Sequence, residues 1–328
     1  MRLGCMIMPR DLAGTRAAAQ AAEQANLSWI AFGDSPVVFG DSYLHQAEAA
    51  RVTQDIHVGP MVSHVVVRHP VVVAGLLSTL QELSGGRAIC VLGTGNSAAR
   101  GIGLPPARLS QLRAAVAMMR EHWAGRAAAF GDSVVPATGV ARPTAPIFLA
   151  GDGPKIARLG GKIGDGFIFS GAIDDELIRR RQAAAADAPF WVAAAVSPAT
   201  TITEVRDDLG SVLVAIGNRA LRGDLTERGV PQHLHAEVRA MHDRYDYGQH
   251  GAHERPVNAA IISRELSEFL ADRFCLWGDD IQLGSRLHAL DAAGCAGVMF
   301  IVNRPDPVDT IVTLGQRIGR LRMTADAG

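Results

Sequence analysis

The sequence predicts a (β/α)8 barrel, and three observations lead to this fold class. Short apolar runs alternate with longer amphipathic stretches along almost the whole chain, as in parallel sheets joined by helical crossovers. Eight apolar runs can be counted, which suits a closed barrel better than an open sheet of about six strands. The length of 328 residues also fits one such barrel.

The predicted strands are short and bounded by turn-forming or charged residues. They comprise Leu3–Met8, Trp29–Gly33, His57–Val62, Ala88–Gly93, Ile147–Gly151, Gly166–Ser170, Trp191–Ser197 and Val298–Val302.

The stretches between the strands are amphipathic and predict helices. They comprise Leu12–Asn26, Ser42–Thr53, Pro70–Leu83, Leu109–Trp123, Pro154–Ile163, Asp174–Ala186, a long polar segment near Thr201–Arg273, and Ile281–Ala293.

Two stretches depart from this alternation. Gly125–Pro146 combines Gly, Pro and β-branched residues, which predicts a loop or hairpin insertion. Gly210–Arg273 is rich in His and Arg and only weakly periodic, so we expect a helical insertion near the barrel mouth, where a lid can lie over a substrate. We therefore predict one domain over residues 1–322 and a disordered tail over 323–328.

Composition narrows the class of partner. Hydrophobic residues make up 48% of the chain and charged residues 20%, which is globular composition. The net charge is −1, with 32 basic and 33 acidic residues, so no overall field attracts nucleic acid or an anionic membrane. A small-molecule partner is favoured, and local basic residues can still hold one anionic group.

The cysteines and the N-terminus indicate a reduced, cytoplasmic protein. Cys5, Cys90, Cys275 and Cys295 are far apart and form no CxxC pair, so we interpret them as core thiols. The first residues lack the pattern of a secretory signal, and no window approaches ~20 uninterrupted apolar residues.

In a parallel barrel the chemistry lies just after the strands, so the residues at the strand ends are the candidates for function. The second strand ends in WIAFGDS, which places Asp34 and Ser35 at the rim. A carboxylate there can orient a substrate or relay a proton, or it can cap the following segment. The residues alone leave both interpretations open.

The third strand contains Gly59 and Pro60, which signal an irregular backbone because Pro cannot donate to the ladder. His64, Arg68 and His69 follow. A lone histidine is more often structural than catalytic, and no second histidine stands at the i+4 spacing of a helical zinc site, so we predict no metal.

The fourth strand ends in VLGTGNS. Gly93 and Gly95 allow the backbone to approach a ligand closely, while Thr94 and Asn96 supply hydrogen-bonding side chains. The pattern is not a Rossmann fingerprint, because it does not open the first βα unit and its third glycine is misplaced.

The fifth and sixth strands lead into glycine-rich turns. Gly151 and Gly153 precede Pro154, a favoured first helical residue, so free backbone N–H groups at a helix N-terminus predict an anion site. Ser170 and Gly171 lie one unit later and can add donors to the same anion. A tight turn that needs glycine would explain either loop alone. For the two loops together, one shared anion site is the simpler explanation.

Taken together, these segments resemble the luciferase-like flavin-dependent oxidoreductases, most closely the branch with methylenetetrahydromethanopterin reductase and deazaflavin-dependent dehydrogenases. The resemblance rests on residues 29–62, on RHP…LSGGRA…LGTG over residues 68–95, and on PIFLAGDGPKIARLGGKIGDGFIFSG over residues 146–171, with a weaker echo over 274–300.

The resemblance implies roles for individual residues. Asp34 matches the family's acidic residue beside the cofactor ring. Met61–Val62 matches the position of a non-prolyl cis peptide that supports the ring. Gly93, Thr94 and Gly95 match the loop that lines the cofactor's side chain, and Gly153, Ser170 and Gly171 match the phosphate-binding positions. Asn96 and Gly151 are added to the predicted cofactor contacts from the residues alone.

Two positions depart from the sugar-phosphate dehydrogenases of this branch. They carry histidine after the acidic residue, where this chain has Ser35, and glutamate after the fourth-strand glycine, where it has Asn96. A copied acid/base pair is therefore absent. We expect the catalytic groups among Asp34, Ser35 and His64.

The resemblance implies an oxidoreductase that transfers a hydride between coenzyme F420 and a small organic substrate, in a homodimer. One alternative is an FMN-dependent monooxygenase on the same scaffold, and a second is a cofactor-binding protein without turnover. The GDS after the second strand and the branch of the family favour the deazaflavin.

Overall fold

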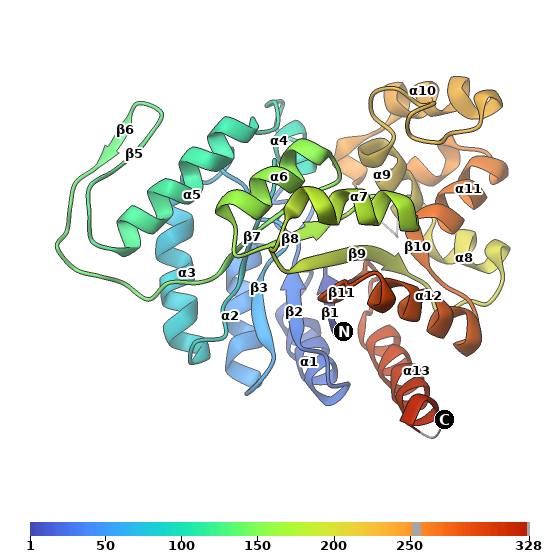
Figure 1. The fold of residues 1–328 in the computed structure, drawn as a ribbon, viewed down its shortest axis with the longest axis horizontal. Coiled ribbons are helices and arrows are strands. Elements are labelled where there is room, and N and C mark those ends of the chain that lie inside the picture. The colour runs from blue at the N-terminus through green and yellow to red at the C-terminus, as the bar shows by residue number, and fades with distance from the viewer. Residues whose placement is uncertain (251–256, 327–328) are drawn as a thin grey trace.

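The computed structural model describes residues 1–250 and 257–326, and it is built around a parallel barrel (Figure 1). Eight strands follow one another in the order β3-β2-β1-β11-β9-β8-β7-β4. Isolated parallel bridges, Val58 with Ala88 and Ser63 with Leu92, join β3 to β4 and so bring the two ends of this order together. The predicted fold class is confirmed.

The barrel strands begin and end within two residues of the predicted positions. They are β1 (Arg2–Ile7), β2 (Trp29–Phe32), β3 (His57–Pro60), β4 (Cys90–Leu92), β7 (Ile147–Gly151), β8 (Gly166–Phe169), β9 (Phe190–Val196) and β11 (Gly297–Val302).

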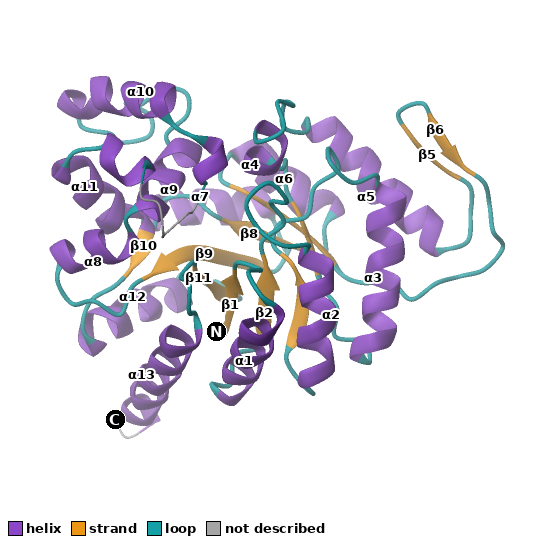
Figure 2. Ribbon diagram, turned by 180° about the vertical axis from the view of Figure 1, so that it is seen from behind, coloured by secondary structure: helices purple, strands orange, loops and turns teal. Residues whose placement is uncertain are grey.

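Helices surround the strands, as Figure 2 shows from behind. The predicted ones are α1 (Leu12–Gln24), α2 (Ser42–Val52), α3 (Pro70–Ser84), α5 (Leu109–Trp123), α6 (Pro154–Ile163), α7 (Asp175–Ala185) and α12 (Asp280–Ala292).

Two further helices were not predicted, the short α4 (Asn96–Arg100) and the long α13 (Val308–Asp326). Helix α13 buries Ile311, Leu314 and Ile318, which recur at helical spacing and pack against the body of the barrel. The helix continues to Asp326, into the stretch 323–328 for which the sequence predicted a disordered tail. Residues 327–328 lie outside the described part of the chain.

The insertion after α5 is a hairpin, as the sequence allowed. Strands β5 (Ala128–Phe130) and β6 (Ser133–Val135) pair antiparallel, and Figure 1 shows them projecting away from the barrel.

The late insertion consists of several helices that lie together beside one side of the barrel (Figure 1). They share an apolar cluster that includes Leu213, Val238 and Leu270, so the weak periodicity of the sequence concealed a real core. The elements are α8 (Ile202–Leu209), α9 (Ser211–Ala220), α10 (His235–Arg244), α11 (Arg264–Phe274), the 3₁₀ turns η1 (Gln232–Leu234), η2 (Tyr247–Gln249) and η3 (Asn258–Ile261), and the short strand β10 (Cys275–Leu276), which pairs with the end of β9.

The barrel itself has two apolar layers. Inside, Trp29 makes edge-to-face contacts with Phe148 and Trp191. Outside, a larger cluster fills the space between the strands and the helices. All four cysteines are free and buried, which confirms them as core thiols, and burial raises the pKa of Cys5 to about 12. Among the described residues, no helix combines the length and the apolar character needed to cross a membrane.

Candidate active site at the barrel mouth

Asp34 lies two residues after β2, and its carboxylate accepts hydrogen bonds from two neighbouring side chains. It is 5% exposed. Ser63 donates its hydroxyl to Oδ2 at 3.2 Å, while Arg68 donates from Nε to Oδ2 at 3.4 Å and from Nη2 to Oδ1 at 3.5 Å. The N-cap of α2 is Asp41. The interpretation of Asp34 as a helix cap is therefore wrong, and its contacts are tertiary.

The bend at the end of β3 places Ser63 beside this carboxylate. The Met61–Val62 peptide bond is cis, as the family resemblance implied. After the bend, pairing with β4 resumes, because Ser63 N donates to Val91 O at 2.8 Å and Gly93 N donates to Ser63 O at 3.0 Å. Ser63 is thus fixed by backbone bonds with its hydroxyl toward Asp34.

Tyr43, on α2, completes a chain of donors that ends on Asp34. Its hydroxyl donates to Ser63 Oγ at 2.9 Å, and burial raises its pKa well above the usual value. The phenol therefore keeps its proton. Every hydrogen bond in the chain therefore runs toward the carboxylate of Asp34.

Arg68 links the loop after β2 to the loop after β3. Its Nη2 contacts Asp41 Oδ2 at 2.7 Å, and its guanidinium lies 5.2 Å from the centre of the Tyr43 ring. Burial by itself lowers the pKa of Arg68, but the hydrogen bond to Asp41 and the charge of Asp34 raise it. Two carboxylates and an aromatic face thus hold one cation.

The hydrogen bonding and the burial of His64 argue against a role as a general acid. Its Nε2 lies 3.1 Å from the backbone carbonyl of Asp34, which can only accept, so Nε2 carries the proton. Burial lowers the pKa of His64 more than the nearby Asp34 raises it, and the ring is neutral. Its Nδ1 is buried and finds no partner among the described residues.

Ser35 does not contact Asp34 through its side chain. Its hydroxyl lies 3.1 Å from that of Ser97, on α4. Of the three predicted catalytic residues, His64 therefore hydrogen-bonds to the backbone carbonyl of Asp34. The third, Ser35, lies apart from them, with its hydroxyl facing the segment after β4.

In the loop after β4, packing within the protein requires glycine at positions 93 and 95. A Cβ on Gly93 would lie 2.7 Å from Val62 Cγ2, and one on Gly95 would lie 2.7 Å from His64 Cβ. Close packing against the bent strand therefore requires both glycines even without a ligand, and their place beside a cofactor stays a prediction. Asn96 accepts a hydrogen bond from Arg100 through its Oδ1 at 2.9 Å, and Thr94 is half-buried.

The loops after β7 and β8 come together, and one glycine among them is open. A Cβ on Gly151 or Gly171 would lie against Ile156 or the Phe169 ring, at 2.7 Å and 2.4 Å, whereas one on Gly153 would meet nothing within 4 Å. Gly153 is the N-cap of α6, and no side chain caps this helix. The first N–H groups of α6 therefore lack a side-chain cap, and the space beside the Gly153 Cα is open.

The two loops border one pocket of about 350 Å³, whose other wall comes from the helical insertion. The pocket contains Pro154 and Gly171 together with several arginines. Arg181 donates to the Asp152 carbonyl at 2.8 Å, and Arg228 lies 3.7 Å from the Asp152 carboxylate. Four carboxylates, from Asp152, Asp174, Glu176 and Glu227, line the same pocket, so the formal charges of its lining balance.

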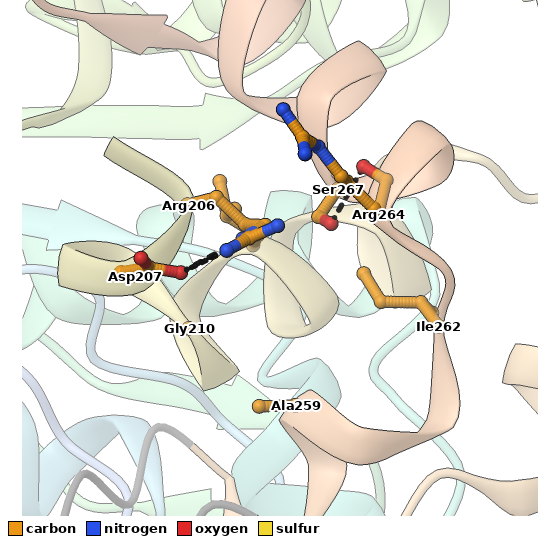
Figure 3. A pocket seen from close by; sticks show the side chains of 8 residues that line it. Arg206, Asp207, Gly210, Ala259, Ile262, Arg264 and Ser267 are labelled. Carbon is orange, nitrogen blue, oxygen red and sulfur yellow. Dashed lines mark hydrogen bonds and ion pairs between the residues drawn. The ribbon is translucent and has the colours of Figure 1, made fainter. Parts of the chain in front are cut away.

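Another pocket, of about 370 Å³, lies within the insertion (Figure 3). Its two arginines already have partners, because Arg206 contacts Asp207 and Arg264 contacts Glu268 at 2.6 Å. It lies among α8, η3 and α11, away from the strand ends. Within residues 1–250 and 257–326, no group of three His, Cys, Asp or Glu side chains is arranged to hold a metal.

Sequence reasoning did not place Tyr43 and Ser63 in the site, and it noted Arg68 without a role. The signal for Arg68 was its position before His69–Pro70 in the motif that carries the family resemblance. Nothing in the sequence indicated that it pairs with Asp34, because the two are 34 positions apart.

Solved structures share this fold over nearly the whole chain. The F420-dependent tetrahydromethanopterin reductase of Methanopyrus kandleri matches with a TM-score of 0.77 at 18% identity, covering 98% of this chain and 99% of that one. An F420-dependent secondary alcohol dehydrogenase in complex with an F420–acetone adduct matches with a TM-score of 0.71 at 15% identity, covering 98% of each chain.

Curated relatives match in sequence over a shorter stretch. An F420-dependent glucose-6-phosphate dehydrogenase of Intrasporangium calvum is 37% identical over 145 residues, 40% of this chain and 43% of that protein. The 5,10-methylenetetrahydromethanopterin reductase of Archaeoglobus fulgidus is 29% identical over 124 residues, 36% of this chain and 37% of that protein. The chain thus spans about two fifths of the length of these relatives.

The sequence pattern of the luciferase-like monooxygenases matches residues 1–297, which is most of the chain. Seven of the eight barrel strands, the bend after β3 and the open N-terminus of α6 fall within this match, which ends at the first residue of β11. The chain belongs to the luciferase-like monooxygenase family.

Proposed function

We propose that this protein is an F420-dependent oxidoreductase that transfers a hydride between the deazaflavin and a small organic substrate. The F420-dependent relatives support the choice of cofactor. The observation that carries the proposal is the barrel mouth itself, which has a bonded carboxylate corner on one side and an open, uncapped helix N-terminus on the other. A ring and a phosphate of one cofactor need two such regions.

In this proposal the cofactor phosphate binds at the N-terminus of α6. Gly153 leaves the space, the first N–H groups of α6 donate, and Ser170 and Gly171 adjoin the same loop, where Ser170 N bonds to Gly151 O at 3.2 Å. Gly151 acts indirectly, by allowing Ile156 to pack under the turn. The residues present therefore fit an anionic group.

The ring lies, in this proposal, against the bend after β3. Met61 and Val62 form the surface beneath it, Asp34 lies at its edge, and the 93–96 loop borders the cofactor's side chain through Gly93, Thr94, Gly95 and Asn96. When bound, the deazaflavin supplies a carbon, C5, that gives or takes a hydride.

Reduction of a carbonyl, or oxidation of an alcohol, moves a proton as well as a hydride. We assign that proton to Asp34. Its Oδ2 is occupied by Ser63 and Arg68, whereas Oδ1 accepts only the 3.5 Å contact from Arg68 among the described residues. Oδ1 is therefore the atom with spare capacity to accept a proton directly or through one water.

Arg68 and His64 act as positioning residues. Arg68 holds the Asp34 and Asp41 carboxylates on one guanidinium, and His64 holds the Asp34 backbone carbonyl. Ser35 and Ser97 remain as hydroxyls beside the loop after β4, where they can orient a substrate.

The alternative cofactor is FMN, which also presents a ring and a phosphate. It is the cofactor in the solved complex of an oxygenating component of 3,6-diketocamphane monooxygenase, which matches with a TM-score of 0.60 at 18% identity. The corresponding activity would be a monooxygenase. A protein that binds the cofactor without turnover is the third possibility.

Titration of the purified protein with F420 and with FMN separates these functions, with quenching of cofactor fluorescence as the readout. We expect saturable binding of F420, negligible binding of NAD or zinc, and turnover in a screen of alcohols, aldehydes and ketones. Binding of FMN alone would overturn the proposal in favour of the monooxygenase. Binding of F420 without turnover across the screen would support a carrier. Gel filtration of the same sample tests the expected homodimer.

A further inference from the structure

A shallow pocket of about 500 Å³ lies between α5 and α6, on the outside of the barrel. Its lining includes four cationic side chains and no acidic one: Arg113 from α5, and Lys155, Arg158 and Lys162 from α6. We call these four residues and the pocket they line the basic groove. The chain as a whole has a net charge of −1, so this group of four positive charges is a local feature of the surface.

The cations of the basic groove are exposed and have no carboxylate partner among the described residues. Lys155, Arg158 and Lys162 recur at helical spacing, so they share one face of α6, opposite the buried Ile156 and Ala157. The first turn of α6 contains no acidic residue and does contain Lys155, although the positive end of the helix dipole disfavours a cation there. This arrangement opposes the stability of the isolated helix and favours a bound anion.

The basic groove begins where the proposed phosphate site ends. Lys155 follows Gly153 and Pro154 directly, on the same helix. On the other side of this turn lies the pocket bordered by the insertion, where four arginines are accompanied by four carboxylates, so the formal charges of its lining balance. Among the described residues of these two pockets, an anionic chain that continues beyond the phosphate therefore meets a net positive charge on the α5–α6 side.

We propose that the basic groove binds the chain of glutamates that coenzyme F420 carries beyond its phosphate. This inference rests on the proposed function. From Lys155 to Lys162 the helix rises by about 10 Å, the length of roughly three extended residues, so two or three carboxylates can lie along it. FMN ends at its phosphate and would leave the groove unused.

The test compares two deazaflavins, one with several glutamates and one that ends at the phospholactate without them. Their dissociation constants are measured by fluorescence quenching at low ionic strength and again in about 0.5 M salt. The proteins are the wild type, the double variant Arg158→Gln/Lys162→Gln, and a control, Arg51→Gln/Arg244→Gln, which removes the same charge from exposed positions on α2 and α10.

We expect the wild type and the control to bind the glutamate-bearing form about 10-fold more tightly than the glutamate-free form, and high salt to abolish this preference. We expect the groove variant to lose the preference while its affinity for the glutamate-free form is unchanged. Equal affinities in the wild type, or a preference that survives in the groove variant, would overturn the inference and leave the proposed function intact. Failure of both deazaflavins to bind would overturn the proposed function itself.

Discussion

The two sides of the barrel mouth are built in different ways. Around Asp34, which follows β2, side chains from two further segments bond to one another: Tyr43 from α2, and Ser63 and Arg68 from the segment after β3. Around Gly153, the site is made of backbone and empty space, because α6 lacks a side-chain cap.

This difference suggests that the two sides of the barrel mouth have different functions. A group that handles a proton must be held in one position, and interlocking hydrogen bonds achieve this. A group that binds a permanent anion needs only donors with little ordering cost, and a helix N-terminus provides them locally. Substitutions on the two sides should therefore affect different measurements.

The largest effect is expected for Asp34→Asn. The amide keeps the size of the side chain but cannot accept a proton, so we expect turnover to fall by roughly 100-fold or more, in line with general acid–base contributions. Cofactor affinity should change little. Steady-state kinetics together with fluorescence titration would check both expectations. Near-normal turnover in a folded variant would leave Asp34 as a purely structural residue.

The next effect is expected for Gly153→Asp, on affinity rather than on turnover at saturation. The new carboxylate would cap α6 and stand against the cofactor phosphate, and two charges at about 4 Å repel by roughly 4 kcal/mol at an intermediate dielectric. We expect affinity to fall by at least about 10-fold and the fold to remain intact. The matched control is Gly153→Ala, whose Cβ has open space and should cost little. Unchanged affinity in the Asp variant would remove this loop from the site.

Arg68→Met tests whether the carboxylate corner also stabilises the fold. The substitution leaves the buried Asp34 facing Asp41 without the shared cation, so we expect a loss of about 1–3 kcal/mol in the free energy of unfolding. Arg120→Met is the control, since it removes an exposed pair with Asp165 that should contribute at most about 1 kcal/mol. Urea denaturation measures both. Equal losses in the two variants would contradict a special role for Arg68.

The smallest effect concerns pH. Burial lowers the pKa of His64, so between that value and the ordinary pKa near ~6.5 the unfolded chain binds a proton that the folded chain does not. Stability contributed by the neutral ring is therefore present above the ordinary pKa and is lost as the pH falls below it. We expect His64→Gln to reduce the slope of melting temperature against pH below ~6.5. An unchanged slope would show that other groups dominate acid unfolding.

The strand positions, most helices, the hairpin and the glycine-rich turns were predictable from the sequence, because each depends on a local pattern: apolar runs of strand length, helical periodicity, or Gly before Pro154 at a helix start. The resemblance carried by RHP and LGTG also placed the cis peptide at Met61–Val62.

Only the tertiary structure decided which side chains meet. Asp34 faces Arg68, Tyr43 reaches Ser63, and Gly93 lies under Val62, because the bend after β3 brings these segments to one corner. The paired positions are 20 to 34 residues apart, and such separations leave no periodic signal in the sequence. For the same reason the sequence did not predict α13 or the apolar core of the insertion. The apolar residues of these segments are recognised as core only when the surfaces that they pack against are known.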